Sequence, residues 1–456
     1  MSDLEGLANI LLDKNFPEEK IVDELVREIQ TFKRVNRPQA EVLAKAVLSE
    51  VIRSRRKPKD RLLREILTPS ASGITMGEMG VGCRGEGDFY VHTLIARIAS
   101  MGGSPLLGPL SLDDAGAVRE GETVVVVAVD GTHSRLSSFP LIAGFHVARA
   151  ALRDVYVKGA KPIALFDDLH LADDGDVGKL FDFVAGVCVV SELSGVPLVS
   201  GSTLRVGGDM VIGDRMVSCV GAVGVVKDPK HLAARRNVKP GDLILMTEGA
   251  GGGTIATAAI YSGKFNVLKE TLNLKFIETC RFLLEKNLSR LADAMTDVTN
   301  GGIRGDAYAI CKEAKVGIVI DHEAFRSLVN PKVLSLLEEL AIDPLGVSID
   351  SLLIFAPEAN AETLRKEIKS LGVKVEVVGE VVDRPRKAFL AENGGRVELK
   401  PKFRESAYTE VKKVVGEEAE ASLSELKAKV MKAYRVALTK RSMLLREVRR
   451  KLSREN

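Results

Sequence analysis

Two adjacent carboxylates, Asp113 and Asp114, stand just before the hydrophobic run from Thr123 to Val129. That run is followed directly by Asp130 and Gly131. A run of β-branched residues that ends in a carboxylate and a glycine is typical of a buried strand that delivers an acid to a loop. We therefore expect residues 123–129 to form a strand, with Asp130 at its end and close to the aspartate pair.

Three carboxylates brought together repel one another, by about 4 kcal/mol for a pair about 4 Å apart at an effective dielectric constant of about 20. A bound cation removes this repulsion, and oxygen ligands suit Mg²⁺, which keeps several waters and usually takes a phosphate ligand as well. In the alternative interpretation the acids are protonated or point apart. Asp113-Asp114 is then a turn closed by its own side chain, and Asp130-Gly131 is an ordinary strand end. These residues alone leave both interpretations open.

The composition excludes several classes of protein. The chain of 456 residues carries a formal net charge of only +3, so no general attraction to polyanions is implied. Its five cysteines form no CxxC pair, which argues against a disulfide framework or a zinc site. No long uncharged apolar stretch and no basic leader are present, so we expect a cytoplasmic protein without a membrane span. The absence of Trp and the abundance of Lys, Arg and Glu favour a thermophilic source.

The pattern along the chain predicts four parts. Helical spacing dominates residues 1–70, whereas short β-rich runs alternate with helices in residues 71–228 and again in residues 238–392. The last part, residues 404–456, reads as helix from about residue 405 onward and becomes increasingly basic. We therefore expect an α/β (α+β) protein of two domains with helical N- and C-terminal extensions.

Two glycine-rich segments are candidates for binding an anion. Six glycines crowd into residues 73–87, and Gly249-Ala-Gly-Gly-Gly253 lies between a predicted strand and a predicted helix. Free backbone N–H groups at the start of a helix favour anions, although a flexible lid is an equally good interpretation of the first segment. Neither segment has the Gly-Lys-Ser/Thr ending of a P-loop.

Several motifs, in the right order, resemble the AIR synthase (PurM-like) superfamily, and especially its HypE and selenophosphate synthetase branches. The stretches that carry the resemblance are Leu112-Asp-Asp-Ala-Gly-Ala-Val118, Val129-Asp-Gly-Thr-His133, Arg153-Asp-Val-Tyr-Val-Lys-Gly-Ala-Lys-Pro162, Val199-Ser-Gly-Ser-Thr-Leu-Arg205 and Thr296-Asp-Val-Thr-Asn-Gly-Gly-Ile303. Each motif is weak alone, but five in order over roughly residues 70–390 make the resemblance strong.

The resemblance implies a particular architecture and cofactor. Two α/β domains are expected, with ATP and Mg²⁺ in the cleft between them. The N-terminal domain is expected to pair with that of a second copy to complete a β-barrel, which makes the protein a homodimer. Members of the superfamily transfer or activate through the γ-phosphoryl group of ATP. The implied activity is therefore an ATP-dependent phosphoryl-transfer or cyclo-ligase-like reaction on a small amide, carboxylate or phosphate substrate.

The resemblance also assigns roles to individual residues. The implied Mg²⁺ ligands are Asp113, Asp114, Asp130 and Asp297. The implied ATP-binding residues are Asp113, Asp114, Asp154, Gly201, Thr203, Asp297, Asn300, Gly301 and Gly302. The implied catalytic residues are Asp130, His133 and Lys158, although Lys158 on a helix is equally well interpreted as a surface lysine.

Two departures from the family pattern keep a second function open. Arg153 replaces the usual asparagine before Asp154, and Ser202 stands where relatives carry an acid. The chain also ends without the C-terminal cysteine that HypE needs. The alternative is a catalytically weak nucleotide-binding protein whose helical arms bind a client protein, or RNA at the basic C-terminal helix.

Overall fold

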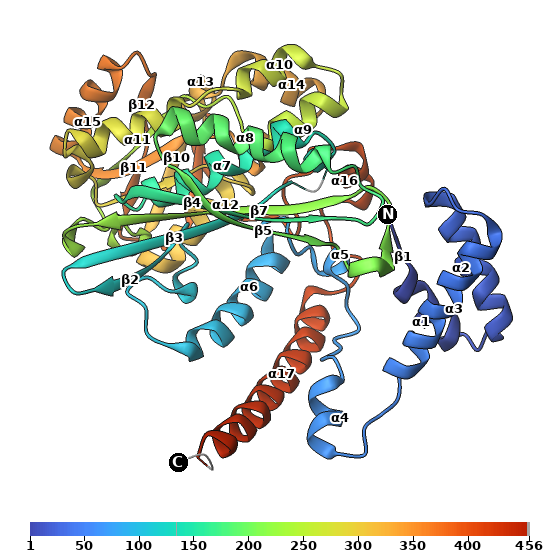
Figure 1. The fold of residues 1–456 in the computed structure, drawn as a ribbon. Coiled ribbons are helices and arrows are strands. Elements are labelled where there is room, and N and C mark those ends of the chain that lie inside the picture. The colour runs from blue at the N-terminus through green and yellow to red at the C-terminus, as the bar shows by residue number, and fades with distance from the viewer. Residues whose placement is uncertain (134, 454–456) are drawn as a thin grey trace.

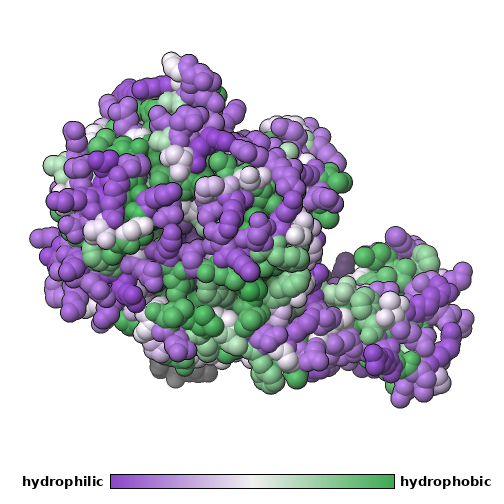
Figure 2. Space-filling model, turned by 90° about the horizontal axis from the view of Figure 1, so that it is seen from above, coloured by the Kyte–Doolittle hydropathy of each residue, from purple (hydrophilic) through white to green (hydrophobic). Residues whose placement is uncertain are grey.

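The computed structural model describes residues 1–133 and 135–453. They form two α/β bodies packed against each other, a helical N-terminal lobe and one long projecting C-terminal helix (Figure 1). Seen from above, the N-terminal lobe stands apart on one side of the main body (Figure 2).

The first α/β body is built on a five-stranded sheet in the order β2-β3-β7-β4-β5. Its strands are β2 (Gly116–Glu120), β3 (Thr123–Gly131), β4 (Lys161–Leu171), β5 (Leu198–Arg205) and β7 (Met216–Val226). All neighbours are antiparallel except β4 and β5. The predicted strand is confirmed as β3, and it ends with Asp130 and Gly131 as expected.

Helices α7 (Pro140–Tyr156) and α8 (Gly178–Ser194) pack against each other and cover one face of this sheet. They approach closely because Gly186 has no side chain, and a Cβ there would lie 2.0 Å from the carbonyl oxygen of Leu141. The opposite face of the sheet carries apolar side chains that remain exposed, including Val127, Val129 and Val217. A face of this kind needs a partner to bury it.

The second α/β body has a mixed seven-stranded sheet in the order β14-β13-β10-β12-β8-β11-β9. Its strands are β8 (Asp242–Thr247), β9 (Ala294–Asp297), β10 (Gly317–Asp321), β11 (Leu352–Pro357), β12 (Val375–Val382), β13 (Ala388–Glu392) and β14 (Gly395–Glu398). Its helices are α9 (Gly253–Tyr261), α10 (Phe265–Thr271), α11 (Lys275–Glu285), α12 (Gly302–Ala314), α13 (His322–Leu328), α14 (Pro331–Glu339) and α15 (Glu358–Ser370). One continuous hydrophobic cluster includes residues of α7, α11 and β11, so the two bodies share a core.

The N-terminal lobe consists of β1 (Ser2–Asp3), α1 (Leu4–Asp13), α2 (Glu18–Phe32) and α3 (Arg37–Ser54). Its small hydrophobic core also takes in Ile212 of β6 (Val211–Ile212). The lobe is further attached to the first body by the pairing of β1 with β6 and by the ammonium of Lys33, which lies within 2.8 Å of Asp173 and Asp174. The lobe is followed by α4 (Arg61–Leu67), α5 (Met76–Met79) and α6 (Glu86–Ala99).

The C-terminal part differs from the sequence prediction. The chain was expected to be helical from about residue 405, but helix begins only with α16 (Glu410–Val415) and α17 (Leu423–Leu452). Residues 399–409 form an irregular segment. Ser406 takes a positive φ of 61°, which interrupts any helix there, and Thr409 is the N-cap residue of α16. Helix α17 then packs beside α4 and α6 (Figure 1).

Across residues 1–133 and 135–453, no helix combines the length and the apolar character that crossing a membrane requires.

Candidate functional site

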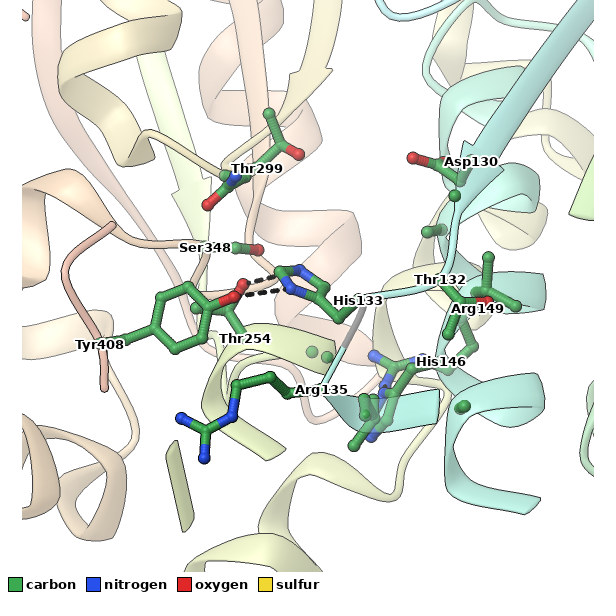
Figure 3. A pocket seen from close by; sticks show the side chains of 18 of the residues that line it. Asp130, Thr132, His133, Arg135, His146, Arg149, Thr254, Thr299, Ser348 and Tyr408 are labelled. Atoms are coloured by element: carbon green, nitrogen blue, oxygen red, sulfur yellow. Dashed lines mark hydrogen bonds between the residues drawn. The ribbon is translucent and has the colours of Figure 1, made fainter. Parts of the chain in front are cut away.

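A cavity of about 380 Å³ lies between the two α/β bodies. Its walls come from the end of β3, from α7, from the start of α9, from the loop before α12 and from the C-terminal segment. The lining side chains gather around His133 (Figure 3). The residues that line the cavity and enter the argument below are Asp130, His133, Arg135, His146, Arg149, Arg153, Gly252, Gly253, Thr254, Asn300, Tyr408 and Lys412.

The charge of the cavity wall favours an anion. Among the described residues that line it, four carry basic side chains, Arg135, Arg149, Arg153 and Lys412, and one carries a carboxyl group, Asp130. Arg149 and Arg153 already pair with Asp350, which leaves Arg135 and Lys412 for a ligand. The backbone at Gly252 and Gly253 begins α9 at the same wall, as predicted for the second glycine-rich segment. Helix N-termini and arginines are both used to hold phosphate oxygens.

His133 is held from two sides. Its Nδ1 lies 2.8 Å from the hydroxyl oxygen of Tyr408, and its Nε2 lies 3.2 Å from the hydroxyl oxygen of Thr254 (Figure 3). Burial lowers the pKa of His133 to about 4 and raises the pKa of Tyr408. The imidazole is therefore neutral near pH 7, and one of its ring nitrogens can accept a proton.

Asp113 and Asp114 lie behind the cavity wall in a buried cluster with two cations. Lys158 is fully buried, with its ammonium 2.5 Å from Asp113 and 2.9 Å from Asp114. The guanidinium of Arg235 pairs with Asp114, and its backbone N–H donates to Asp113 at 2.9 Å. Burial opposes the ionised form of Asp114, but Arg235 and Lys158 outweigh it and lower its pKa to about 2. Asp114 is therefore ionised, and both carboxyl groups already have cationic partners within the chain.

A second set of buried acids comprises Asp130, which lines the cavity, and Asp154 and Asp297, which interact with it electrostatically. Burial, together with neighbouring carboxylates, raises the pKa of all three, and that of Asp297 to about 7. Arg153 approaches Asp297 at 2.9 Å and also pairs with Asp350. The Arg153 guanidinium thus lies between two buried carboxyl groups of the second α/β body.

Two of the four predicted Mg²⁺ ligands fit the ion, and two do not. In the part of the chain that is described, no three His, Cys, Asp or Glu side chains are grouped so as to hold a metal ion. Asp113 and Asp114 do not fit the ion, because Lys158 and Arg235 already occupy their oxygens. Asp130 Oδ2 and Asp297 Oδ1 do fit it, since both are buried and make no hydrogen bond. The four predicted ligands are therefore not assembled as one set.

The glycine loop of the second body reaches the site, whereas the strand predicted to bind ATP does not. Asn300 lines the cavity, and Gly301 and Gly302 take positive φ values of 91° and 62° at the start of α12. In contrast, Gly201 and Thr203 lie exposed on the edge strand β5 and do not line the cavity.

Several residues of the site were missed from the sequence. They are Arg149, Arg235, Asp350, Tyr408 and Lys412. Arg149 had a usable signal, because it lies four residues before Arg153 on the same face of a predicted helix. The others carry no motif, and only the fold brings them to the cavity or to the buried acids.

The Asp297→Asn substitution tests the raised pKa. The folded carboxyl has a pKa of about 7 against the ordinary 3.8 of the unfolded chain. Between these values only the folded state keeps the proton, so the wild type loses stability as the pH rises from about 4 to about 7. Asparagine does not titrate. We therefore compare the two free energies of unfolding, variant minus wild type. This difference should rise by up to about 4 kcal/mol as the pH rises from about 4 to about 7.

Urea unfolding curves at pH 4.5 to 8 measure this difference. The exposed Asp182→Asn variant on α8 is the control, and its difference from the wild type should stay flat. A flat difference for Asp297→Asn as well would contradict the raised pKa.

Comparisons with known proteins give the chain a family. Residues 112–226 match the N-terminal domain of AIR synthase related proteins, and residues 239–392 match the C-terminal domain. An uncharacterized protein of Methanocaldococcus jannaschii is 51% identical over 99% of this chain and 100% of that protein. Carbamoyl dehydratase HypE of Rhodobacter capsulatus is 27% identical over 55% of this chain and 71% of that enzyme.

The fold is shared with a solved structure of AaThiL complexed with AMPPCP and TMP. The TM-score is 0.53 at 18% sequence identity, and the match covers 70% of this chain and 96% of AaThiL. The two matched domains together span more than half of the present chain, and the cavity lies between them. The resemblance seen in the sequence motifs is thereby confirmed, and the chain belongs to the AIR synthase-related family.

Proposed function

We propose that this protein is an ATP- and Mg²⁺-dependent enzyme that transfers the γ-phosphoryl group of ATP to an oxygen of a small amide, carboxylate or phosphate substrate. The observation that carries the proposal is the cavity between the two family domains, which is lined by Arg135, by Lys412 and by the backbone at the start of α9. A polyphosphate chain supplies the negative charge that this wall lacks. AaThiL, which has the same fold, was solved with AMPPCP, an analogue of ATP.

The residues of the cavity have distinct parts in this reaction. Arg135 and the N–H groups at the start of α9 hold phosphate oxygens, and Asp130 and Asp297 would hold Mg²⁺, while Arg149 stays paired with Asp350. Magnesium usually takes only one or two protein carboxylates and completes its shell with phosphates and water. When bound, it neutralises charge on the phosphates.

The transfer itself needs little covalent chemistry from the protein. The bond between the γ-phosphorus and the bridging oxygen breaks, a bond to the acceptor oxygen forms, and ADP leaves. Neutral His133 lines the cavity with both ring nitrogens on protein hydroxyls, so a proton from the acceptor reaches it through Tyr408 or Thr254. Lys158 is too deeply buried to touch a ligand, so we assign it the role of holding Asp113 and Asp114.

Isothermal titration of ATP, with and without Mg²⁺, tests the proposal when it is followed by a phosphate-release assay on the same sample. We expect binding that strengthens with Mg²⁺ and slow release of phosphate that an acceptor accelerates. Binding without any release would favour the alternative of a nucleotide-binding partner protein. No binding of ATP would overturn both. The binding of a client protein or RNA at the C-terminal helix stays a prediction.

We also propose that the protein is a homodimer that pairs the exposed apolar faces of two five-stranded sheets into a barrel. Val127, Phe166 and Val217 project from three neighbouring strands of this face and are 45%, 36% and 55% exposed. Burying such a face against a second copy removes its apolar area from water.

The Val217→Glu substitution tests the dimer. A carboxylate in the centre of the paired face should turn the dimer into a monomer, because burying an unpaired charge costs several kcal/mol. Light scattering coupled to size exclusion measures the mass. Val42→Glu, on exposed α3 of the N-terminal lobe, is the matched control and should keep the mass of the wild type. A wild type that is already monomeric at micromolar concentration would refute the proposal.

A further inference from the structure

The segment from Leu399 to Lys412, here called the closing segment, lies beyond the part of the chain that matches the family. The matched C-terminal domain ends at residue 392. The closing segment is nevertheless buried along most of its length, including polar Glu405, Ser406 and Thr409. A polar, irregular segment is buried only where its groups find partners.

The closing segment finds those partners in the loops that border the cavity. Ser406 accepts a hydrogen bond from the Gly301 N–H at 3.1 Å and donates to the Gly346 carbonyl at 3.0 Å. Its hydroxyl also contacts the side-chain oxygen of Asn300. Glu405 forms a buried ion pair with Arg304 at 3.2 Å. The segment is therefore anchored on the glycine loop that begins α12.

The closing segment also holds the N-terminal glycine-rich loop. The Glu86 N–H donates to the Lys402 carbonyl at 2.9 Å, and the Glu405 N–H donates to the Cys83 carbonyl at 3.1 Å. A Cβ at Gly85 would lie 2.1 Å from the carbonyl oxygen of Phe403, so this glycine permits the close approach. Residues 82–86 and the α12 loop are thus joined through a segment that neither of them adjoins in sequence.

From this anchored position, Tyr408 and Lys412 face the cavity. The Lys412 ammonium lies 4.1 Å from the centre of the Tyr408 ring. No carboxylate pairs with it among the ion pairs of residues 1–133 and 135–453, and burial lowers its pKa. A half-buried ammonium without a counter-ion is costly, and an anion in the cavity would supply the missing charge.

We propose that Lys412 binds a phosphate group of the ligand and that Tyr408 is a positioning residue for His133. The closing segment thereby contributes functional residues to the site. The inference rests on the proposed function and deepens it. The phosphate belongs either to the polyphosphate chain of ATP or to an anionic acceptor beside it, and Lys412 would contact both by the same chemistry.

Titrations of the full-length wild type, Lys412→Met and Lys413→Met separate these sources. Lys413 is the matched control, because its ammonium contacts the Leu340 carbonyl instead of the cavity. The probes are ATP, inorganic pyrophosphate, and inorganic phosphate added to protein saturated with a non-hydrolysable ATP analogue. We expect Lys412→Met to weaken at least one of them by about tenfold, the loss of one charge-assisted contact, while Lys413→Met does not.

Each result has a distinct meaning. Weaker binding of ATP and pyrophosphate places Lys412 on the polyphosphate chain, and weaker binding of phosphate alone places it on the acceptor. Unchanged binding of all three probes would overturn the role of Lys412 and leave the proposed function intact. If the wild type binds pyrophosphate but not ATP, the proposed function fails. The effect of Lys412→Met on the binding of pyrophosphate still tests the role of Lys412 in that case.

Tyr408→Phe tests the positioning role, because it removes one hydroxyl and keeps the ring. We expect the acid limb of the pH profile of phosphate release to shift along the pH axis. It shifts to higher pH if the Tyr408 hydroxyl donates a hydrogen bond to His133, and to lower pH if the hydroxyl accepts one. Tyr434→Phe on α17 is the control and should keep the wild-type profile. An unchanged profile for Tyr408→Phe would overturn the positioning role.

Discussion

Replacing Lys158 by methionine is expected to lower the free energy of unfolding by about 3–5 kcal/mol. The methionine has a similar length and fills the same space, but it removes the cation that lies 2.5 Å from Asp113 and 2.9 Å from Asp114. It also leaves the Met295 carbonyl, which accepts a hydrogen bond from Lys158 at 3.0 Å, without that donor. The two aspartates are then left with Arg235 as their one remaining cationic partner. Urea unfolding followed by circular dichroism gives the value.

Lys161→Met is the matched control for this experiment, because Lys161 is exposed at the start of β4, three residues along the chain. Its effect should stay within about 0.5 kcal/mol. Adding Asp113→Asn to Lys158→Met should recover part of the loss, since it removes one of the uncompensated charges. A loss below about 1 kcal/mol for Lys158→Met would show that the buried cluster is not held by this ammonium.

The second large effect is expected for Asp130→Asn, which should lower the rate of phosphate release by about 100-fold or more. Asp130 ends β3 at the cavity, and one of its oxygens is buried without a hydrogen bond. Asparagine keeps the shape but presents a weaker, neutral oxygen to a cation. Stability should change little, because burial and a neighbouring carboxylate already disfavour the charge of Asp130 in the absence of a ligand.

Steady-state phosphate release at saturating ATP and varied Mg²⁺ measures this effect, and raising the Mg²⁺ concentration should restore part of the rate. Asp182→Asn, an exposed carboxylate on α8, should behave like the wild type. Full activity of Asp130→Asn with an unchanged Mg²⁺ dependence would remove Asp130 from the site.

The parts of the fold that could be predicted from sequence are those specified by short-range patterns. The β-branched run before Asp130 gave strand β3, and the glycines before Thr254 gave the start of α9 at the cavity. The family resemblance added the relation between the two domains, because five separate motifs occur in the same order. These features depend on neighbours in the chain and not on distant contacts.

The ion pairs of the site could not be predicted from the sequence. Asp113 and Asp114 were predicted to hold Mg²⁺, but the sequence could not reveal that Lys158 and Arg235 meet them, since Arg235 lies more than 120 residues further along the chain. Lys158 itself has no local signal for burial. A lysine on a helix is usually exposed, and only its place beneath the cavity wall makes it a counter-ion.

The C-terminal residues were predicted least well, for the same physical reason. Helical propensity is a local preference, and the contacts of Ser406 and Tyr408 with the two bodies override it. Gly201 and Thr203 were assigned to ATP from their motif position alone. Strand β5 carries them to the exposed edge of the sheet, away from the cavity, and their role in binding ATP stays a prediction.

The closing segment also makes the site depend on contacts between distant parts of the chain. Tyr408 meets His133 across 275 residues of sequence, and the Glu405 N–H meets the Cys83 carbonyl across a longer span. Contacts of such long range must first offset the loop-closure entropy of the chain between them. The hydrogen bond at His133 is therefore expected to form late in folding, after the local contacts within each sheet.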